Sequence, residues 1–169
     1  SGSSRTGSAP RILKVPVTSS EYYLIENRQR DPNRDRITIG RDENGRKAEF
    51  DSTGRVVAPS GIGVLTRIDE YDFGLPGSGL LIWHVDEEVI AANLTANTVN
   101  NNRDHRGVDL VECDGAQDIG YIYSFLDAGY GTESGDWWDP WWAGNESHKI
   151  VNESDQVVFS EASIPNSGA

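Results

Sequence analysis

The chain of 169 residues contains no methionine and only one cysteine. Methionine is missing even at position 1, so we expect a processed or excised piece of a longer polypeptide. The single cysteine, Cys113, excludes an internal disulfide bond and is expected to be a small buried residue rather than a nucleophile. The sequence also lacks an apolar run of about 18 residues, and it therefore predicts no transmembrane segment.

Positive charge is also scarce. Lys and Arg number 15 against 27 Asp and Glu, which gives a formal net charge of −12 at pH 7. Nucleic acids and anionic membranes are bound through Lys and Arg, so this balance argues against both as partners. It favours cations, and calcium is the expected one because extracellular fluid holds enough of it to fill modest oxygen-ligand sites. An acidic surface that serves solubility alone is the alternative.

The composition predicts a mainly β fold. Hydrophobic residues make up 36 % of the chain, and 18 glycines with 7 prolines indicate short strands joined by long loops. We expect an antiparallel or mixed sheet or sandwich with one short helix and long ordered loops. Residues 1–10 are predicted to be a flexible linker or tag, and residues 11–169 a single β-rich domain. That domain is expected to contain a hairpin insertion at about 27–59 and a Trp/Asp-rich loop region at about 116–145.

One apolar segment is the strongest structural signal. Leu80–Val85 follows a Pro-Gly turn and lacks polar alternation, which predicts a central strand covered on both faces. Asp86 follows it and is expected to cap a helix built from Val89–Ala92. Residues 119–126 fit either a short helix or a strand. Other strands are predicted at 12–17, 21–26, 36–39, 46–50, 55–58, 63–68 and 108–112. The Asp-Glu-Asn-Gly turn at 42–45 predicts a hairpin between the strands that flank it.

Acidic residues cluster after two of the predicted strands and in the loop beyond them. If these strands are neighbours, the carboxylates converge, and converging like charges require a cation, a cationic side chain or shared protons. A calcium site is one interpretation; helix caps, Asx turns and pairs with Arg28, Arg103 or Arg106 are the other. The six candidate ligands are Asp86, Glu87, Asp109, Glu112, Asp114 and Asp118.

A second candidate calcium site is formed by Asp31, Asn33 and Asp35. Their oxygen-bearing side chains alternate as they do at the start of a calcium-binding loop. The match is incomplete, because Arg36 stands where such loops have glycine and Asp42 stands where they have a bidentate Glu. A solvated approach to a hairpin is the alternative interpretation.

His84 and His105 are candidates for zinc ligands together with Asp86 and Asp114. The spacing of these residues does not match that of known zinc motifs, so a buried, hydrogen-bonded His84 is the preferred interpretation. No serine stands in a Gly-x-Ser-x-Gly turn, and the sequence therefore predicts no acyl-transfer triad.

Four of the five tryptophans fall within six residues, as Trp137, Trp138, Trp141 and Trp142. Exposed tryptophans stack on glycans or on protein surfaces, which would make this segment a binding loop. Buried tryptophans would instead anchor the loop to the sheet. The anchor role is the preferred interpretation.

Three ordered blocks of sequence resemble a known family. The blocks are Glu21–Gln29, Asp72–Glu87 and Gly107–Gly115. In this order they resemble the segments that follow the catalytic core in immune inhibitor A-type secreted zinc metallopeptidases. The resemblance covers roughly residues 12–145.

The resemblance implies a secreted or cell-surface protein, a zinc-dependent endopeptidase, calcium for stability and a multidomain precursor. The chain departs from the family because it lacks the His-Glu-x-x-His helix that supplies two zinc ligands and the general base. We therefore expect no catalysis from this chain alone, and zinc only if its ligands lie outside it. The expected role is that of a non-catalytic part that supports the peptidase core or substrate cleft and binds calcium.

The expected partners are the catalytic part of the same precursor or further copies of the chain. The rival hypothesis is an extracellular binding or self-assembly module that forms a filament or surface layer. Such a module would use the Trp-rich loop for glycans or a protein substrate, and its strand edges for strand addition.

Overall fold

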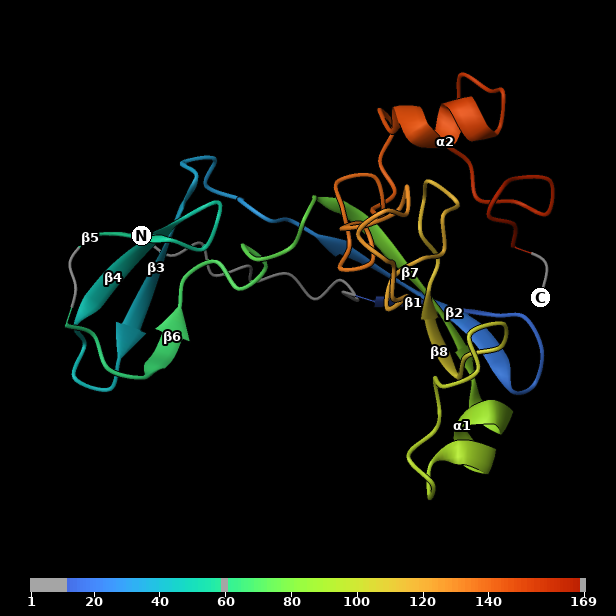
Figure 1. Ribbon diagram of the computed structural model, residues 1–169, viewed down its shortest axis with the longest axis horizontal. Coiled ribbons are helices and arrows are strands. Elements are labelled where there is room, and N and C mark those ends of the chain that lie inside the picture. Colours follow the sequence, from blue (N-terminus) through green and yellow to red (C-terminus); the bar gives the residue numbers. More distant parts are fainter. Residues whose placement is uncertain (1–11, 59–60, 168–169) are drawn as a thin grey trace. The chain divides into compact units, whose positions relative to one another are not determined.

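The computed structural model describes residues 12–58 and 61–167 and divides into two compact units (Figure 1). Among the described residues, the first unit comprises 28–58 and 61–78, and the second comprises 12–27 and 79–167. Each unit holds a four-stranded sheet, so the prediction of a mainly β fold is confirmed. The expected hairpin insertion lies in the first unit, which continues to Ser78. The expected linker at 1–10 lies outside the described residues.

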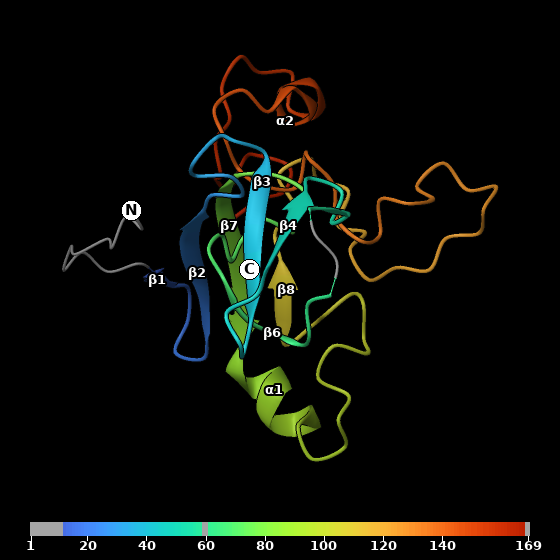
Figure 2. The same cartoon turned by 90° about the vertical axis from the view of Figure 1, so that its left-hand side faces the viewer.

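The sheet of the second unit has the strand order β1-β2-β7-β8. Figure 2 shows β2, β7 and β8 side by side. β1 and β2 form an antiparallel hairpin, and β7 pairs with β8 in antiparallel register. These strands span Ile12–Pro16 (β1), Glu21–Arg28 (β2), Gly79–Asp86 (β7) and Val108–Leu110 (β8).

The predicted central strand is confirmed as β7, which lies between β2 and β8. Successive residues of a strand point to opposite faces. Leu81 and Ile82 are both buried, so both faces of the sheet are covered at this point. Leu80, at the start of the strand, is 41 % exposed, so the coverage does not extend along the whole strand.

Two short helices belong to the second unit, one more than predicted. α1 (Glu87–Asn93) begins at the expected cap, because the Asp86 carboxylate accepts hydrogen bonds from the first turn. α2 (Glu146–Val151) begins in the same way at Asn145, whose side-chain oxygen accepts from the His148 amide. Neither helix has the length and apolar character needed to span a membrane.

The segment 119–126 forms neither a helix nor a strand, so both predictions for it are wrong. Ser124 and Asp127 are joined by reciprocal turn hydrogen bonds, which take the place of a strand ladder or a helical repeat. Ile122 and Phe125 are 91 % and 75 % exposed. Figure 2 shows this loop, in gold, extending away from the sheet.

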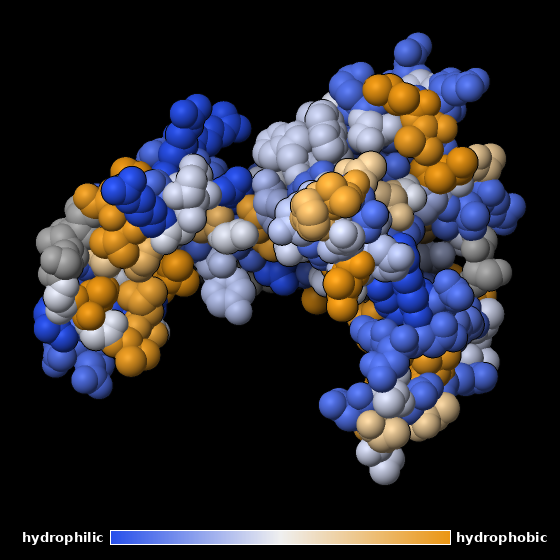
Figure 3. Space-filling model, viewed as in Figure 1, coloured by the Kyte–Doolittle hydropathy of each residue, from blue (hydrophilic) through white to orange (hydrophobic). Residues whose placement is uncertain are grey.

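The sheet of the first unit has the strand order β5-β4-β3-β6. β3 pairs with β4 in a long hairpin, β6 pairs with β3 and β5 pairs with β4, and all three pairings are antiparallel. Apolar side chains are exposed along β5, along β6 and just before β6, and Figure 3 shows apolar surface gathered on this unit. They are Val56, Val57, Val64, Leu65 and Ile68. The strands span Ile37–Asp42 (β3), Lys47–Asp51 (β4), Val56–Ala58 (β5) and Leu65–Ile68 (β6).

The hairpin between β3 and β4 is organised by Asp42. Its carboxylate accepts hydrogen bonds from the amides of Gly63, Arg46 and Asn44 and from the Arg46 guanidinium. The Gly63 amide has the largest effect, and together these donors lower the pKa of Asp42 to about 2. The predicted turn at 42–45 is therefore confirmed, and Asp42 is committed to it.

The core of the second unit is built around Trp141. The backbone N–H and C=O of Trp141 exchange hydrogen bonds of 2.9 Å with Leu80, which joins the loop to β7. The indole N–H donates to the Val111 carbonyl at 2.7 Å. Trp141 is 5 % exposed, so the anchor role is confirmed for this tryptophan. The buried cluster consists of Tyr23, Ile82, Val111, Cys113 and Trp141, and Cys113 is buried as predicted.

Replacing Trp141 with alanine is expected to lower the free energy of unfolding by about 3–5 kcal/mol, because it removes a buried ring and leaves a cavity. Trp137→Ala is the matched control: Trp137 is 49 % exposed, so its loss should cost less than about 1 kcal/mol. Urea denaturation followed by circular dichroism measures both values. Equal losses in the two variants would contradict the anchor role of Trp141.

Candidate metal centre

Three carboxylates converge beyond the end of β8. One oxygen from each of Glu112, Asp114 and Asp139 lies within 4.8 Å of the other two. Glu112 and Asp114 follow β8 directly, and the Cys113 amide between them donates to the Asp139 carbonyl at 2.9 Å. That bond connects the β8 segment to the Trp-rich loop and brings Asp139 to the other two acids.

Backbone amides hold each of these carboxylates in place. Glu112 has no exposed surface, and its carboxylate accepts from the amides of Asp118 and Ile119 at 2.8 and 2.9 Å. Asp139 is 4 % exposed and accepts from the Asp136 amide. Asp114 is half-buried. None of the three carboxylates forms a salt bridge with Lys or Arg in residues 12–58 and 61–167.

The environment of the cluster favours protonated or metal-bound carboxylates. Burial raises the pKa of Glu112 to about 7, and the charges of Asp118 and Asp114 contribute to the rise. Burial raises the pKa of Asp139 to about 7 as well, with contributions from Asp136 and Glu112. The pKa of Asp114 is also raised by burial. A cation at this position would replace the protons and offset the repulsion.

Asp118, the last of the six predicted ligands, lies beside this cluster. Its amide donates to Glu112, and its carboxylate accepts from the Thr132 hydroxyl. The charge of Asp118 contributes to the raised pKa values of Glu112 and Asp114. The structure therefore brings Glu112 and Asp114 together and keeps Asp118 close to both.

The other three predicted ligands have different roles. Asp86 caps α1, and its Oδ2 lies 2.8 Å from His105 Nε2. Asp109 pairs with Arg106 at 2.6 Å, and Glu87 lies exposed in the first turn of α1. These are the helix cap and the arginine pair of the alternative interpretation.

The sequence missed Asp139 as a member of the first cluster. Asp139 is 27 positions beyond Glu112, and no spacing rule connects the two. In the structure its neighbours Pro140 and Trp141 are buried as well, so this part of the loop enters the core. The contact depends on the tertiary position of the Trp-rich loop.

The second predicted site gains a residue that the sequence also missed. Asp31 and Asp35 each offer an oxygen within 4.8 Å of one from Glu70, in the first unit. Asn33 contributes its backbone amide, which donates to Glu70 Oε1 at 3.2 Å. Glu70 closely follows the strand predicted at 63–68, and this position was the available sequence signal. It did not indicate that Asp31 and Asp35 would be the neighbours of Glu70.

The histidines do not join either acidic cluster. His84 Nε2 is buried and has no hydrogen-bond partner among the described residues, although it lies 3.6 Å from Glu21 Oε2. The predicted hydrogen bond of His84 is therefore not found at Nε2. His148 is 1 % exposed, and its ring nitrogens face the Cys113 carbonyl and the Val158 amide.

Of the four tryptophans near the acidic cluster, Trp141 is the buried anchor and the other three contact one another. Trp137 and Trp142 meet edge to face at 5.6 Å between ring centroids, and Trp138 stacks on Trp142 at 6.3 Å. Trp137 is exposed, while the other two are half-buried. This group presents aromatic surface to solvent.

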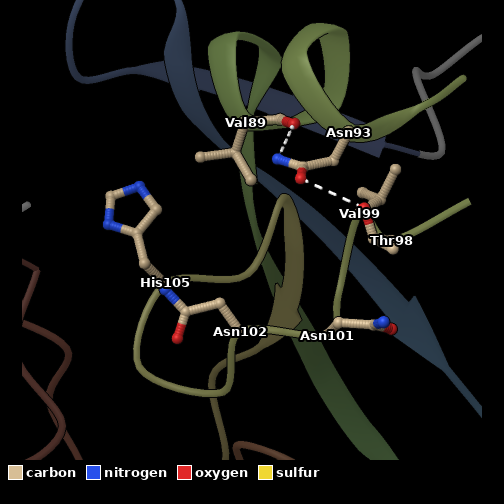
Figure 4. Close-up of a pocket in the computed structure, with 7 residues that line it drawn as sticks. All are labelled: Val89, Asn93, Thr98, Val99, Asn101, Asn102 and His105. Carbon is tan, nitrogen blue, oxygen red and sulfur yellow. Dashed lines mark hydrogen bonds between the residues drawn. The ribbon is translucent and has the colours of Figure 1, made fainter. Parts of the chain in front are cut away.

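A cavity of about 420 Å³ lies between α1 and the loop of residues 98–105 (Figure 4). The Asn93 side chain connects its walls, since it donates to the Val89 carbonyl and accepts from the Thr98 hydroxyl. His105 lies at this cavity and is oriented by Asp86. Because Thr98 donates to Asn93, the cavity lining does not pair a hydroxyl nucleophile with His105.

No family model matches the chain, and comparisons with curated proteins and with solved structures found no match. The sequence blocks Glu21–Gln29, Asp72–Glu87 and Gly107–Gly115 contain β2, β7 and β8, which are neighbouring strands of one sheet.

The raised pKa values predict how stability depends on pH without divalent cations. Folding raises the pKa of Glu112 from 4.5 and of Asp139 from 3.8, in both cases to about 7, so the folded state binds extra protons between these values. The free energy of unfolding should therefore fall as pH rises from about 4.5 through 7. The change in the free energy of unfolding per titrating group should stay below the ideal value of about 1.4 kcal/mol per pH unit. The reason is that Asp114 is half-buried, so water screens the charges of the cluster.

Urea denaturation in the presence of a chelator, followed by tryptophan fluorescence, measures this dependence. Asp139→Asn should reduce the slope, since asparagine keeps an acceptor for the Asp136 amide without the charge. Asp155→Asn, at an exposed position, should leave the slope unchanged. A stability that rises across this pH range would contradict the assignment.

Proposed function

We propose that this chain is a non-catalytic, β-rich part of a secreted metallopeptidase-like protein and that it binds calcium at Glu112, Asp114 and Asp139. The observation that carries the proposal is the convergence of these three carboxylates, two of them buried, within 4.8 Å. Such a group is unfavourable by itself and becomes favourable when a cation neutralises it.

The chemistry of the group favours calcium over zinc. All three side chains offer oxygen atoms, and calcium takes six to eight oxygen ligands, several of which are commonly water. Asp114 is half-buried and leaves one side accessible to water. The nearby nitrogen and sulfur groups are not available, because His148 is engaged on both ring nitrogens and burial raises the pKa of Cys113 to about 12.

The position of the site supports a structural role. It lies where the segment after β8 meets the Trp-rich loop, so a bound ion would fix the loop to the sheet. In a larger precursor, a sheet stabilised in this way would support the peptidase core or its substrate cleft. Zinc and its ligands would then belong to the catalytic part of that precursor.

Calcium is expected to stabilise the second unit. At a calcium concentration about 100-fold above Kd, the free energy of unfolding should rise by about 2.7 kcal/mol. The gain should be larger at pH 7.5 than at pH 5, because protons compete for the carboxylates. All five tryptophans lie in the second unit, so their fluorescence during urea denaturation reports on this unit.

Two variants make the calcium experiment decisive. Asp139→Asn removes a ligand and should abolish most of the gain, whereas Asp155→Asn should keep it. A chelator-treated protein whose stability does not respond to calcium would overturn the proposal. An equal response in the two variants would place the ion elsewhere.

The aromatic group of Trp137, Trp138 and Trp142 supports a second candidate function. Trp137 is 49 % exposed, and exposed tryptophans stack on sugar rings. The chain would then be an extracellular module that binds glycans or a protein substrate. This function predicts that immobilised polysaccharides retain the protein and that Trp137→Ala abolishes the retention. If the protein without this substitution is not retained either, the function is contradicted.

A further inference from the structure

The acidic cluster of the first unit contains a buried atom without a hydrogen-bond partner. Glu70 is 3 % exposed, and its Oε1 accepts from the Asn33 amide. Its Oε2 is buried and has no hydrogen-bond partner in the described residues. A buried carboxylate oxygen left without a donor is costly, so Oε2 is a favourable position for a ligand that the described residues do not supply.

The sheet determines where Glu70 lies. β3 and β6 are antiparallel, with Gly40 opposite Ile68, so the loop before β3 meets the loop after β6. Asp69 fixes this junction, because its carboxylate accepts from the Ile39 amide at 2.7 Å and from the Thr38 hydroxyl at 2.9 Å. Glu70 follows Asp69 and is thereby held against the loop of Asp31 and Asp35.

The two aspartates shape the loop around the same point. The Asp31 carboxylate accepts from the amides of Asp35 and Arg36 at 3.1 and 3.0 Å, which curls the loop. Arg36 takes the left-handed backbone conformation with φ 61°, at the position where calcium-binding loops carry glycine. Asp35 is exposed, so the cluster opens to water on its side.

We infer that Asp31, Asp35 and Glu70 bind one calcium ion, with Glu70 Oε2 as the buried ligand and water on the exposed side. Calcium–oxygen distances of 2.3–2.6 Å place opposite ligands about 4.6–5.2 Å apart, and the three carboxylate oxygens here lie within 4.8 Å of one another. This site is independent of the proposed function, because it belongs to the other unit.

Protonation of Glu70 would compensate the charge of this cluster less completely than a bound cation would. Burial raises the pKa of this carboxyl, and Asp31, Asp35 and Asp69 add to the rise. Protonation would neutralise Glu70 alone and leave the charges of Asp31 and Asp35 close to each other. A divalent cation supplies a partner for Oε2 and offsets two of the three negative charges.

Titration of the full, chelator-treated chain with CaCl2, followed by ¹⁵N–¹H correlation spectra, tests the inference. The amides of Asn33, Asp35 and Arg36 should shift together, because they hydrogen-bond to Glu70 or Asp31. Glu70→Gln should raise the Kd read from these amides by about tenfold or more. Glu43→Gln, in the exposed turn, should leave that Kd unchanged.

The outcomes separate this inference from the proposed function. Glu70→Gln keeps an acceptor for the Asn33 amide, so the Ala48 amide in β4 should remain at its native position and show that the unit is folded. Unshifted Asn33, Asp35 and Arg36 amides at millimolar calcium would overturn the inference, as would an unchanged Kd in Glu70→Gln. The amides of Asp118 and Ile119 report separately on the Glu112 site.

Discussion

The exchange of two backbone hydrogen bonds between Leu80 and Trp141 is the constraint on which the second unit depends. It places the Trp-rich loop against β7, where the ring of Trp141 fills the core. Gly79 is needed beside it, since a Cβ there would lie 2.8 Å from the Trp141 carbonyl oxygen. Once the loop is fixed, Asp139 reaches Glu112, so core packing and the acidic site are parts of one arrangement.

Local chemistry made much of the fold predictable. The apolar run at Leu80–Val85 indicated a central strand because a strand that is covered on both faces needs no polar alternation. Asp86 indicated a helix start, and the Asp-Glu-Asn-Gly turn indicated the long hairpin, because each supplies the hydrogen bonds or the positive φ that its geometry needs. These signals involve residues close together in the chain.

The candidate sites were predictable only in part, because each is completed by a residue distant in sequence. Glu112 with Asp114, and Asp31 with Asp35, could be read from neighbouring acids. Asp139 and Glu70 reach these pairs through a loop–strand bridge and a strand pairing, which periodicity does not reveal. Asp86 and Asp109 are instead held by partners close to them in the sequence, the first turn of α1 and Arg106, as the alternative interpretation of the acidic residues expected.

The edge of the second sheet has a consequence for assembly. β1 is an outer strand of five exposed residues that include Lys14 and Pro16. Proline offers no amide hydrogen, and Lys14 holds its charge over the Tyr22 ring, 3.3 Å from the centroid. An incoming strand would meet a gap in the donor row at Pro16, a device by which natural sheets resist polymerisation. Polymers of this chain that grow by strand addition would therefore have to use an edge other than β1.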